Sequence, residues 1–141
     1  MSDNFVGFAR SPKPDKDRKV SSKEFVIHSD KPFSDCHGVF TTQGGVEKWL
    51  GEITKFDFRP GGKTRYKLNG EEFGATYASI RIPKQVVLIT ETLGEIVFSA
   101  KVKDSSFELT ISFKKALIID EKADWDNATE AVSNIIASEL K

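Results

Sequence analysis

Apolar and polar residues alternate through residues 56–73, FDFRPGGKTRYKLNGEEF, and two glycine-containing turns interrupt the alternation. Asn69-Gly70 predicts a two-residue type I′ hairpin turn, because both central positions of this turn have positive φ. The turn fixes the pairing of the flanking strands, with Tyr66 opposite Phe73, Thr64 opposite Ala75, Leu68 opposite Glu71 and Lys67 opposite Glu72. Aromatic residues then lie on one face of the hairpin and a charged pair lies on the other.

The preceding turn, Pro60-Gly61-Gly62, predicts a three-residue loop with glycine in the left-handed position. This register pairs Phe56 with Tyr66, Phe58 with Thr64, Asp57 with Arg65 and, less favourably, Lys55 with Lys67. A tight turn at Asp104-Ser105 predicts another hairpin. One of its faces pairs Ile96 with Phe113, Phe98 with Ile111, Ala100 with Leu109 and Val102 with Phe107; the other pairs Lys101 with Glu108 and Ser99 with Thr110.

Two more turns, near Pro83-Lys84 and Gly94, complete an antiparallel meander of six strands over about residues 52–113. A change of alternation between Tyr77 and Ile80 predicts a β-bulge that curves the sheet. Only one face of the sheet is apolar, so another element must cover it. We expect a helix over about residues 122–140, with Asp120 or Asp124 as N-cap. Its apolar stripe is Trp125, Ala128, Val132, Ile135, Ile136 and Leu140.

The region before the meander predicts one strand and two short helices. The strand covers about residues 22–29, where polar and apolar residues alternate. Asp30 is the expected N-cap of a first helix, which has Phe33, Cys36, His37 and Phe40 on one face and is broken at Gly44-Gly45. A second helix, VEKWL, ends before Gly51. The order β-α-α-β6-α predicts an α+β fold, a curved antiparallel sheet wrapped around a long C-terminal helix.

Length and composition are those of one globular domain without net charge. The 141 residues contain 21 Lys plus Arg and 21 Asp plus Glu. They lack the cationic excess that nucleic-acid and anionic-membrane binders use. The single cysteine excludes an internal disulfide and favours a reducing compartment, and no apolar run has the length of a membrane span. We therefore expect a soluble cytoplasmic protein with no nucleic-acid partner.

Residues 1–20 are expected to form an arm that precedes a single domain at residues 21–141. Residues 11–22, SPKPDKDRKVSS, contain two prolines and alternating charges but almost no apolar side chain. Phe5, Val6 and Phe8 precede this stretch. Three outcomes are open for them: docking on the domain, docking on a partner protein, or fraying.

The order of elements resembles the helix-grip fold of the START, or SRPBCC, superfamily, which includes birch-pollen-allergen-like proteins and polyketide cyclases. Within it, the sequence is similar to the family of homologues of the activator of heat-shock-protein ATPase. The similarity covers residues 21–140 and rests on VEKWL at 46–50, FDFRPGG at 56–62, the glycine-led strand 74–80 and the helix led by Trp125. Cys36-His37-Gly38 and the N-terminal arm depart from the family pattern.

This resemblance implies a cavity between the sheet and the C-terminal helix, which many superfamily members use for lipids, sterols or polyketide-like molecules. Small residues on or near the inner face, Ala75, Ser79 and Ala100, leave room for a ligand. Alternatively, the aromatic residues simply fill a core. The expected ligand-binding residues are Phe33, Trp49, Phe58, Tyr66, Phe73, Tyr77, Glu91, Phe98, Trp125, Val132 and Ile136. No cofactor is expected.

Catalytic and metal-binding candidates are few. Cys36 and His37 are neighbours on a helix and point about 100° apart, so they do not form a nucleophile–base pair, and Cys36 is expected to fill core space. His28 would complete a metal site with them only if the first strand and the first helix converge. The cations of one hairpin tip are expected to form a solvated surface, namely Arg59, Lys63 and Arg65.

Either plausible turn at Gly94 puts Glu91 on the same face as Ile89, Ile96 and Phe98, where it would supply the polar end of a pocket; alternatively it lies at a strand end and reaches water. Three functions therefore remain open. The preferred one is non-enzymatic binding of a small hydrophobic or amphipathic molecule. The first alternative is a co-chaperone-like interaction module that regulates a heat-shock ATPase through the N-terminal arm. The second is a cyclase- or hydrolase-like enzyme that uses Glu91 with Tyr66 or Tyr77.

Overall fold

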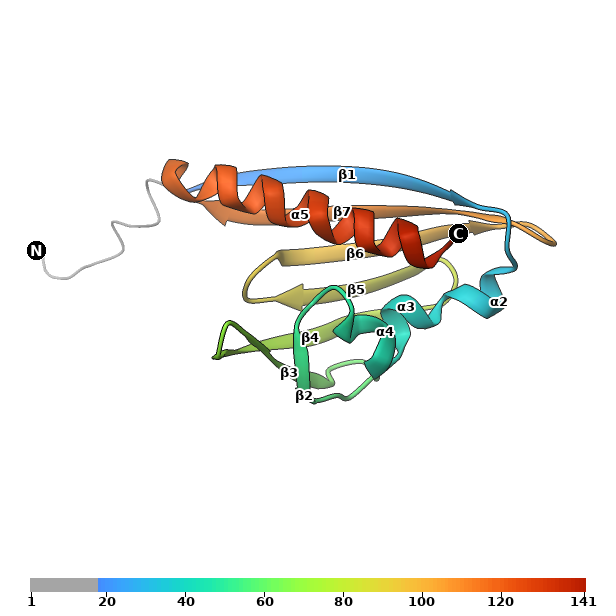
Figure 1. Ribbon diagram of the computed structural model, residues 1–141, viewed down its shortest axis with the longest axis horizontal. Coiled ribbons are helices and arrows are strands. Elements are labelled where there is room, and N and C mark those ends of the chain that lie inside the picture. Colours follow the sequence, from blue (N-terminus) through green and yellow to red (C-terminus); the bar gives the residue numbers. More distant parts are fainter. Residues whose placement is uncertain (1–17) are drawn as a thin grey trace, which may run out of the picture.

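The main structural element of the protein is a single seven-stranded antiparallel sheet (Figure 1). The computed structural model describes residues 18–141, so the predictions for Phe5, Val6 and Phe8 fall outside the described residues. The strands are β1 (Lys19–Ser29), β2 (Glu52–Lys55), β3 (Lys63–Leu68), β4 (Glu71–Arg81), β5 (Gln85–Thr90), β6 (Gly94–Val102) and β7 (Phe107–Leu117). Their order is β1-β7-β6-β5-β4-β3-β2. The predicted meander is confirmed, and β1 joins its β7 edge from Lys19, earlier than the sequence pattern suggested.

The two tight hairpins have the registers that the sequence predicts. Asn69 and Gly70 have φ of 53° and 82°, as a type I′ turn requires. The predicted pairs across β3 and β4 are all present, and so are the six predicted pairs across β6 and β7. The register of β4 against β5 shifts between Tyr77 and Ser79, which confirms the predicted bulge.

The hairpin predicted around Pro60-Gly61-Gly62 is present as the antiparallel pair β2–β3, but its predicted register and three-residue loop are wrong. Strand β2 ends at Lys55, and it places Ile53 rather than Phe56 opposite Tyr66. Residues 56–62 leave β2 and close on β4 instead: the Gly61 N–H donates to the carbonyl of Tyr77, and the carbonyl of Gly62 accepts from the Tyr77 N–H. In this path the rings of Phe58 and Phe56 both pack edge-on against Tyr77, at centroid distances of 4.8 Å and 6.1 Å. Burial of two rings against a third outweighs the extra strand pairs that the prediction assumed.

Three short helices stand where two were predicted: α2 (Phe33–Cys36), α3 (Gly38–Thr41) and α4 (Gln43–Glu47). The first predicted helix is split at His37, and its N-cap is Pro32 instead of Asp30. Gly44-Gly45 does not break a helix but lies inside α4. Gly45 packs so closely on the Gly38 carbonyl that any Cβ there would collide with it.

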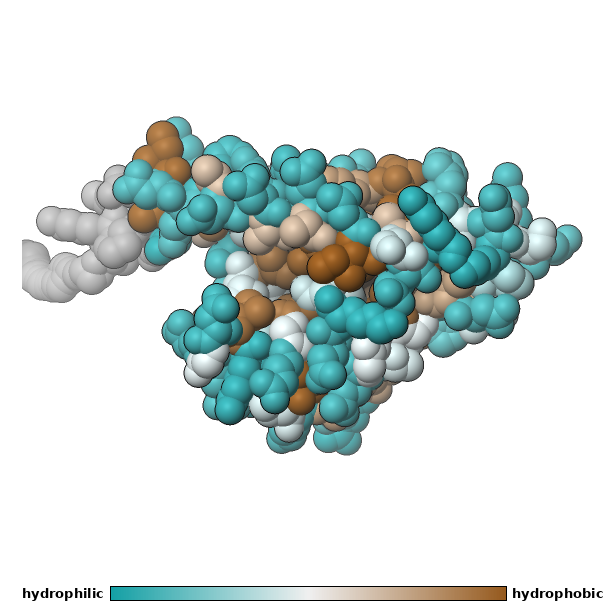
Figure 2. Space-filling view, viewed as in Figure 1, coloured by the Kyte–Doolittle hydropathy of each residue, from teal (hydrophilic) through white to brown (hydrophobic). Residues whose placement is uncertain are grey.

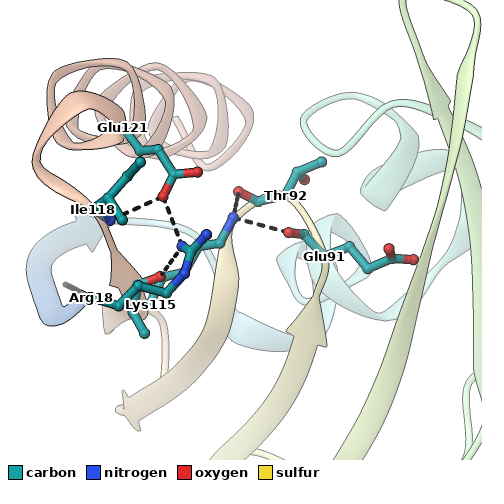
Figure 3. Close-up of polar contacts among 7 residues, drawn as sticks. Arg18, Glu91, Thr92, Lys115, Ile118 and Glu121 are labelled. Carbon is teal, nitrogen blue, oxygen red and sulfur yellow. Dashed lines mark hydrogen bonds and ion pairs between the residues drawn. The ribbon is translucent and has the colours of Figure 1, made fainter. Parts of the chain in front are cut away.

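Helix α5 (Ile119–Glu139) begins three residues before the predicted start, because its N-cap is Ile118 and neither Asp120 nor Asp124. The Glu121 carboxylate accepts from the Ile118 N–H at 3.1 Å and from Arg18 Nη1 at 2.9 Å, which fixes the first turn (Figure 3). The buried stripe is also rotated from the predicted one. Ala128 and Ile135 are exposed, and the buried positions are Trp125, Thr129, Val132, Ser133, Ile136 and Leu140.

Two hydroxyl residues can face the sheet because their own helix satisfies them. Thr129 Oγ1 donates to the Asp126 carbonyl at 2.9 Å, and Ser133 Oγ donates to the Glu130 carbonyl at 2.8 Å. Helix α5 and the three short helices lie on the same side of the sheet, with α5 in front of β1 and β7 and α3–α4 in front of β4 (Figure 1). The core fills the space between these helices and the concave face of the sheet. Within residues 18–141, no helix has both the length and the apolar character needed to cross a bilayer.

Candidate ligand site between the sheet and helix α5

Ten of the eleven predicted ligand-site residues lie together in one apolar core. Two of the ten, Phe58 and Phe73, are half-buried. The buried members are Phe33, Trp49, Tyr66, Tyr77, Phe98, Trp125, Val132 and Ile136. The helices and the sheet thus bring together side chains that are up to a hundred residues apart, as the fold prediction required.

The polar atoms of three aromatic side chains connect the covering helices to one another and to the sheet. Trp125 Nε1 donates to the Leu93 carbonyl at 3.0 Å and ties α5 to the β5–β6 loop. Tyr77 Oη donates to the Phe40 carbonyl at 3.2 Å and ties β4 to α3. Trp49 Nε1 donates to the Val39 carbonyl at 2.7 Å. These bonds let large amphipathic rings be buried without an unpaired donor.

One part of the concave face is entirely apolar. We call it the apolar wall, and it consists of Ile96, Phe98, Leu109, Ile111 and Phe113 on β6 and β7, all buried. Phe98 is stacked on Phe40 with a centroid distance of 4.7 Å and an interplanar angle of 6°. These side chains carry no polar group, so packing alone holds them against the covering helices.

Another part of the concave face carries four hydroxyl groups, from Thr64, Tyr66, Thr90 and Thr92, and we call it the polar corner. Tyr66 Oη and Thr92 Oγ1 are 2.7 Å apart, and the Thr92 N–H also donates to Tyr66 Oη at 3.2 Å. Thr90 Oγ1 accepts from the Leu93 N–H at 2.9 Å and donates to the Gly94 carbonyl at 3.1 Å. Burial raises the pKa of the Tyr66 phenol, so this group stays a neutral hydroxyl in the fold.

The hydroxyl of Thr64 differs from the other three. Among residues 18–141 it is the buried side-chain polar atom that has no hydrogen-bond partner, and Thr64 is 1% exposed. Leaving a buried hydroxyl unpaired costs about 1–3 kcal/mol. The predicted ligand site did not include Thr64, Thr90 or Thr92. The sequence did indicate that Thr64 turns inward, because the predicted hairpin already placed it on the apolar face opposite Ala75.

Glu91 does not lie on the concave face, so its predicted place in the ligand site is wrong. Thr90 pairs with Gly94, and this register puts Leu88 opposite Ile96 while Ile89 faces outward opposite Glu95. Glu91 therefore follows Ile89 onto the outer face, where it is exposed and its carboxylate accepts from the Gly74 N–H. The acid required by the enzyme alternative is thus absent from the interior.

The backbone around Glu91 is held from β7. Lys115 Nζ donates to the carbonyls of Glu91 and Thr92 at 3.0 Å and 3.1 Å (Figure 3). These contacts fix the β5–β6 loop, which also carries the hydrogen bonds to Tyr66 and Trp125. Lys115 thus helps to hold the backbone on which the polar corner depends.

The other candidate groups have structural partners. His37 Nδ1 lies 3.1 Å from Thr41 Oγ1, and Cys36 is buried beside it in the core. His28 is on the outer face, where its Nε2 lies 3.5 Å from a Glu108 carboxylate oxygen. Within the described part of the chain, no group of three or more His, Cys, Asp or Glu side chains is placed to hold a metal ion. Two cations of the predicted hairpin tip form exposed ion pairs, Arg59 with Asp57 and Arg65 with Glu72.

Four surface hollows within residues 18–141 have volumes of about 430, 270, 360 and 350 Å³. Of the eleven predicted ligand-site residues, only Glu91 lines any of these four, and it does so on the outer face. Apolar side chains do reach the surface along a furrow between α5 and the lobe that contains α4, β2 and β3 (Figure 2). Lys48 and Glu139 join α4 to the end of α5 with an Nζ–Oε1 distance of 2.6 Å.

No protein-family model matches the sequence, and a search of curated proteins finds no match. Solved structures do match. The Mll3558 protein from Rhizobium loti is 17% identical, with a TM-score of 0.67 over 87% of this chain and 99% of that chain. Protein BH1534 from Bacillus halodurans is 13% identical, with a TM-score of 0.71 over 88% of this chain and 99% of that chain. Aha1 from Colwellia psychrerythraea, whose structure is that of a dimer, is 14% identical, with a TM-score of 0.68 over 85% of this chain and 96% of that chain.

At these identities the likeness shows the fold. The chain has a helix-grip fold, as the order of its elements predicted, and the structures that share this fold include Aha1, as the resemblance implied.

Proposed function

We propose that the protein binds a small hydrophobic or amphipathic molecule between the concave face of the sheet and helix α5. One observation carries the proposal: the interior is itself amphipathic, with an apolar wall on β6 and β7 and a cluster of buried hydroxyls on β3 and β5. A core that only stabilised the fold would have no need of a hydroxyl at Thr64, whose Oγ1 has no partner among the described residues. The helix-grip fold adds support, because the superfamily that the sequence resembles commonly binds ligands at this place.

Entry to the interior would follow the furrow between α5 and α4 (Figure 2). The Lys48–Glu139 ion pair that spans this furrow is exposed, with 53% and 36% of the two side chains accessible. Exposed ion pairs contribute only about 0–1 kcal/mol. A modest movement of the end of α5 would therefore separate the two sides, and a ligand would take the place of contacts between side chains.

The proposal is tested by native mass spectrometry of the protein purified from its own host. We expect a population whose mass exceeds that of the chain by one small molecule. Val132→Phe enlarges a side chain that α5 turns toward the sheet, so this variant should lose the bound molecule. Ile135→Phe, three residues away on an exposed part of the same helix, is the matched control and should retain it.

Circular dichroism must show that both variants are folded before their masses are compared. If the wild-type protein carries no molecule and also fails to bind naphthalene in solution, the proposal is wrong. Equal retention in Val132→Phe and Ile135→Phe would place the bound molecule outside the interior and would also overturn it.

A further inference from the structure

The Thr64 hydroxyl is a buried polar group that makes no hydrogen bond within the described part of the chain. Its side chain is buried on the concave face of β3, and its Oγ1 has no partner among the described residues. Valine has nearly the same shape and would fill this place without a polar atom. Because buried polar groups are almost always hydrogen-bonded, an unpaired one calls for a partner from outside the chain.

Thr64 has the hydroxyl of the polar corner that is free to bond to a ligand. The hydroxyls of Tyr66, Thr90 and Thr92 are engaged with one another or with the backbone of the β5–β6 loop. A hydroxyl carries one donor and two acceptor positions. Thr64 has all three of these positions free, whereas each of the other hydroxyls already uses at least one of them within the fold.

The strand register places Thr64 in a row of small side chains. Thr64 pairs with Ala75, and Ala75 pairs with Thr90. The neighbouring rows hold large residues, Tyr66 with Phe73 on one side and Tyr77 with Leu88 on the other. A row of small residues between two rows of large ones is the part of the concave face that yields most readily to an inserted group.

The charge of the interior restricts the kind of group that can be inserted. All buried polar residues of the described chain are serines or threonines, namely Ser29, Thr41, Thr64, Thr90, Thr129 and Ser133. No lysine, arginine, aspartate or glutamate is among them. A charged head group would be buried without a counter-ion, which is strongly unfavourable. A neutral oxygen needs only a hydrogen bond.

We propose that Thr64 Oγ1 hydrogen-bonds the single neutral oxygen, a hydroxyl or a carbonyl, of an otherwise hydrophobic ligand. This inference rests on the proposed function, because it requires a ligand in the interior. It adds the chemistry of that ligand: a largely apolar molecule with one uncharged oxygen at the end that reaches β3, and no carboxylate or amine at that end.

The test compares three probes of the same ring size, 2-naphthol, naphthalene and 2-naphthoate, by isothermal titration calorimetry. Wild-type protein should bind 2-naphthol more tightly than naphthalene, and should bind 2-naphthoate weakest. Thr64→Val should weaken 2-naphthol binding about tenfold, the usual size of one hydrogen bond, and leave naphthalene binding unchanged. Thr64→Ser keeps the hydroxyl and should retain the preference. Thr76→Val makes the same change on the outer face of the adjacent strand β4 and should have no effect.

The outcomes separate the two proposals. If wild-type protein binds none of the probes, the proposed function fails and this inference fails with it. If naphthalene and 2-naphthol bind equally well to wild type and to Thr64→Val, binding in the interior stands and the role of Thr64 is wrong.

Thermal unfolding of ligand-free protein supplies a second readout. Thr64→Val should unfold at the same temperature as wild type or at a higher one, because it removes an unpaired polar atom. A clearly lower unfolding temperature would mean that the hydroxyl is already satisfied within the fold, and it would overturn the inference.

Discussion

The apolar wall and the polar corner occupy one continuous concave face, yet they are held in different ways. The wall lies on the β6–β7 hairpin, and its side chains need only contact each other and the covering helices. The corner depends on directed hydrogen bonds to a three-residue loop, and that loop is held by Lys115, which donates to two of its carbonyls, and by Glu91, which accepts from the Gly74 N–H. Packing tolerates small displacements better than hydrogen bonds do. We therefore expect the wall to determine how stable the protein is and the corner to determine what it recognises.

The largest expected effect concerns the wall. Phe98→Ala removes a ring that is 1% exposed and stacks on Phe40, and it should lower the free energy of unfolding by about 3–5 kcal/mol. Thr90→Ala in the corner leaves the Leu93 N–H without its acceptor, and it should cost about 1–3 kcal/mol. Urea unfolding measures both values. Equal losses would remove the distinction between a wall that stabilises and a corner that recognises.

Alkaline pH should destabilise the fold through two buried phenols, that of Tyr66 in the corner and that of Tyr77 outside both regions, whereas the wall has no titratable side chain. Burial raises the pKa of both Tyr66 and Tyr77 above the ordinary tyrosine value. The stability that the neutral phenols contribute is fully present below about pH 10, where tyrosine titrates in the unfolded chain, and it is lost as pH rises toward the folded pKa values. In that range each tyrosine should lower the free energy of unfolding by about 1.4 kcal/mol per pH unit.

Urea unfolding of wild type, Tyr66→Phe and Tyr77→Phe between pH 9 and pH 11 checks this expectation. Each variant should show a smaller pH slope than wild type, even though each also loses a hydrogen bond, to Thr92 or to the Phe40 carbonyl. Unchanged slopes in both variants would mean that neither phenol is kept neutral by burial.

A smaller effect is expected at Glu91, which helps to hold the β5–β6 loop. Glu91→Ala leaves the Gly74 N–H without the carboxylate that accepts from it, and it should lower the free energy of unfolding by about 0.5–1.5 kcal/mol. Glu91→Gln keeps an acceptor oxygen and should retain most of that stability. If Gln were as destabilising as Ala, the negative charge near Arg65, and not the hydrogen bond, would be the important feature.

The same contrast explains how much of the fold could be predicted from sequence. Asn69-Gly70 and Asp104-Ser105 fix their registers locally, so both hairpins were correct to the residue pair. The path of residues 56–62 depends on Tyr77, which lies on another strand, and no local pattern reports that contact. The prediction of the short helices was wrong for a similar reason. Gly45 permits a close approach to the backbone of Gly38 and does not end a helix.

Prediction of the site followed the same division. The apolar candidates were placed in the interior correctly because alternation and helical spacing report which side chains turn inward; their contact with a ligand stays a prediction. Glu91 was misplaced because both turns considered at Gly94 put Ile89 and Glu91 on the face of Ile96. The observed pairing of Thr90 with Gly94 differs in register, and a shift of one residue exchanges the two faces of the sheet. Thr64 was placed on the correct face, but a single threonine among aromatic residues does not reveal whether its hydroxyl has a partner. Only the three-dimensional arrangement answers that question.

The smallest expected effect is at the Lys48–Glu139 ion pair, which joins the lobe near the corner to the helix above the wall. Lys48→Ala should change the free energy of unfolding by at most about 1 kcal/mol, and less at high salt, because exposed pairs are weak and screened.

The effect of Lys48→Ala on the motion of the end of α5 should be clearer than its effect on stability. Hydrogen exchange of the last turn of α5 should become faster, because one of the contacts that hold this turn against α4 is lost. Lys122→Ala is the matched control, since Lys122 pairs with Asp126 inside α5 at 3.0 Å and has no ion pair with another element within residues 18–141. If both variants exchanged equally fast at the end of α5, the ion pair would not restrain the furrow, and ligand entry would have to follow another path.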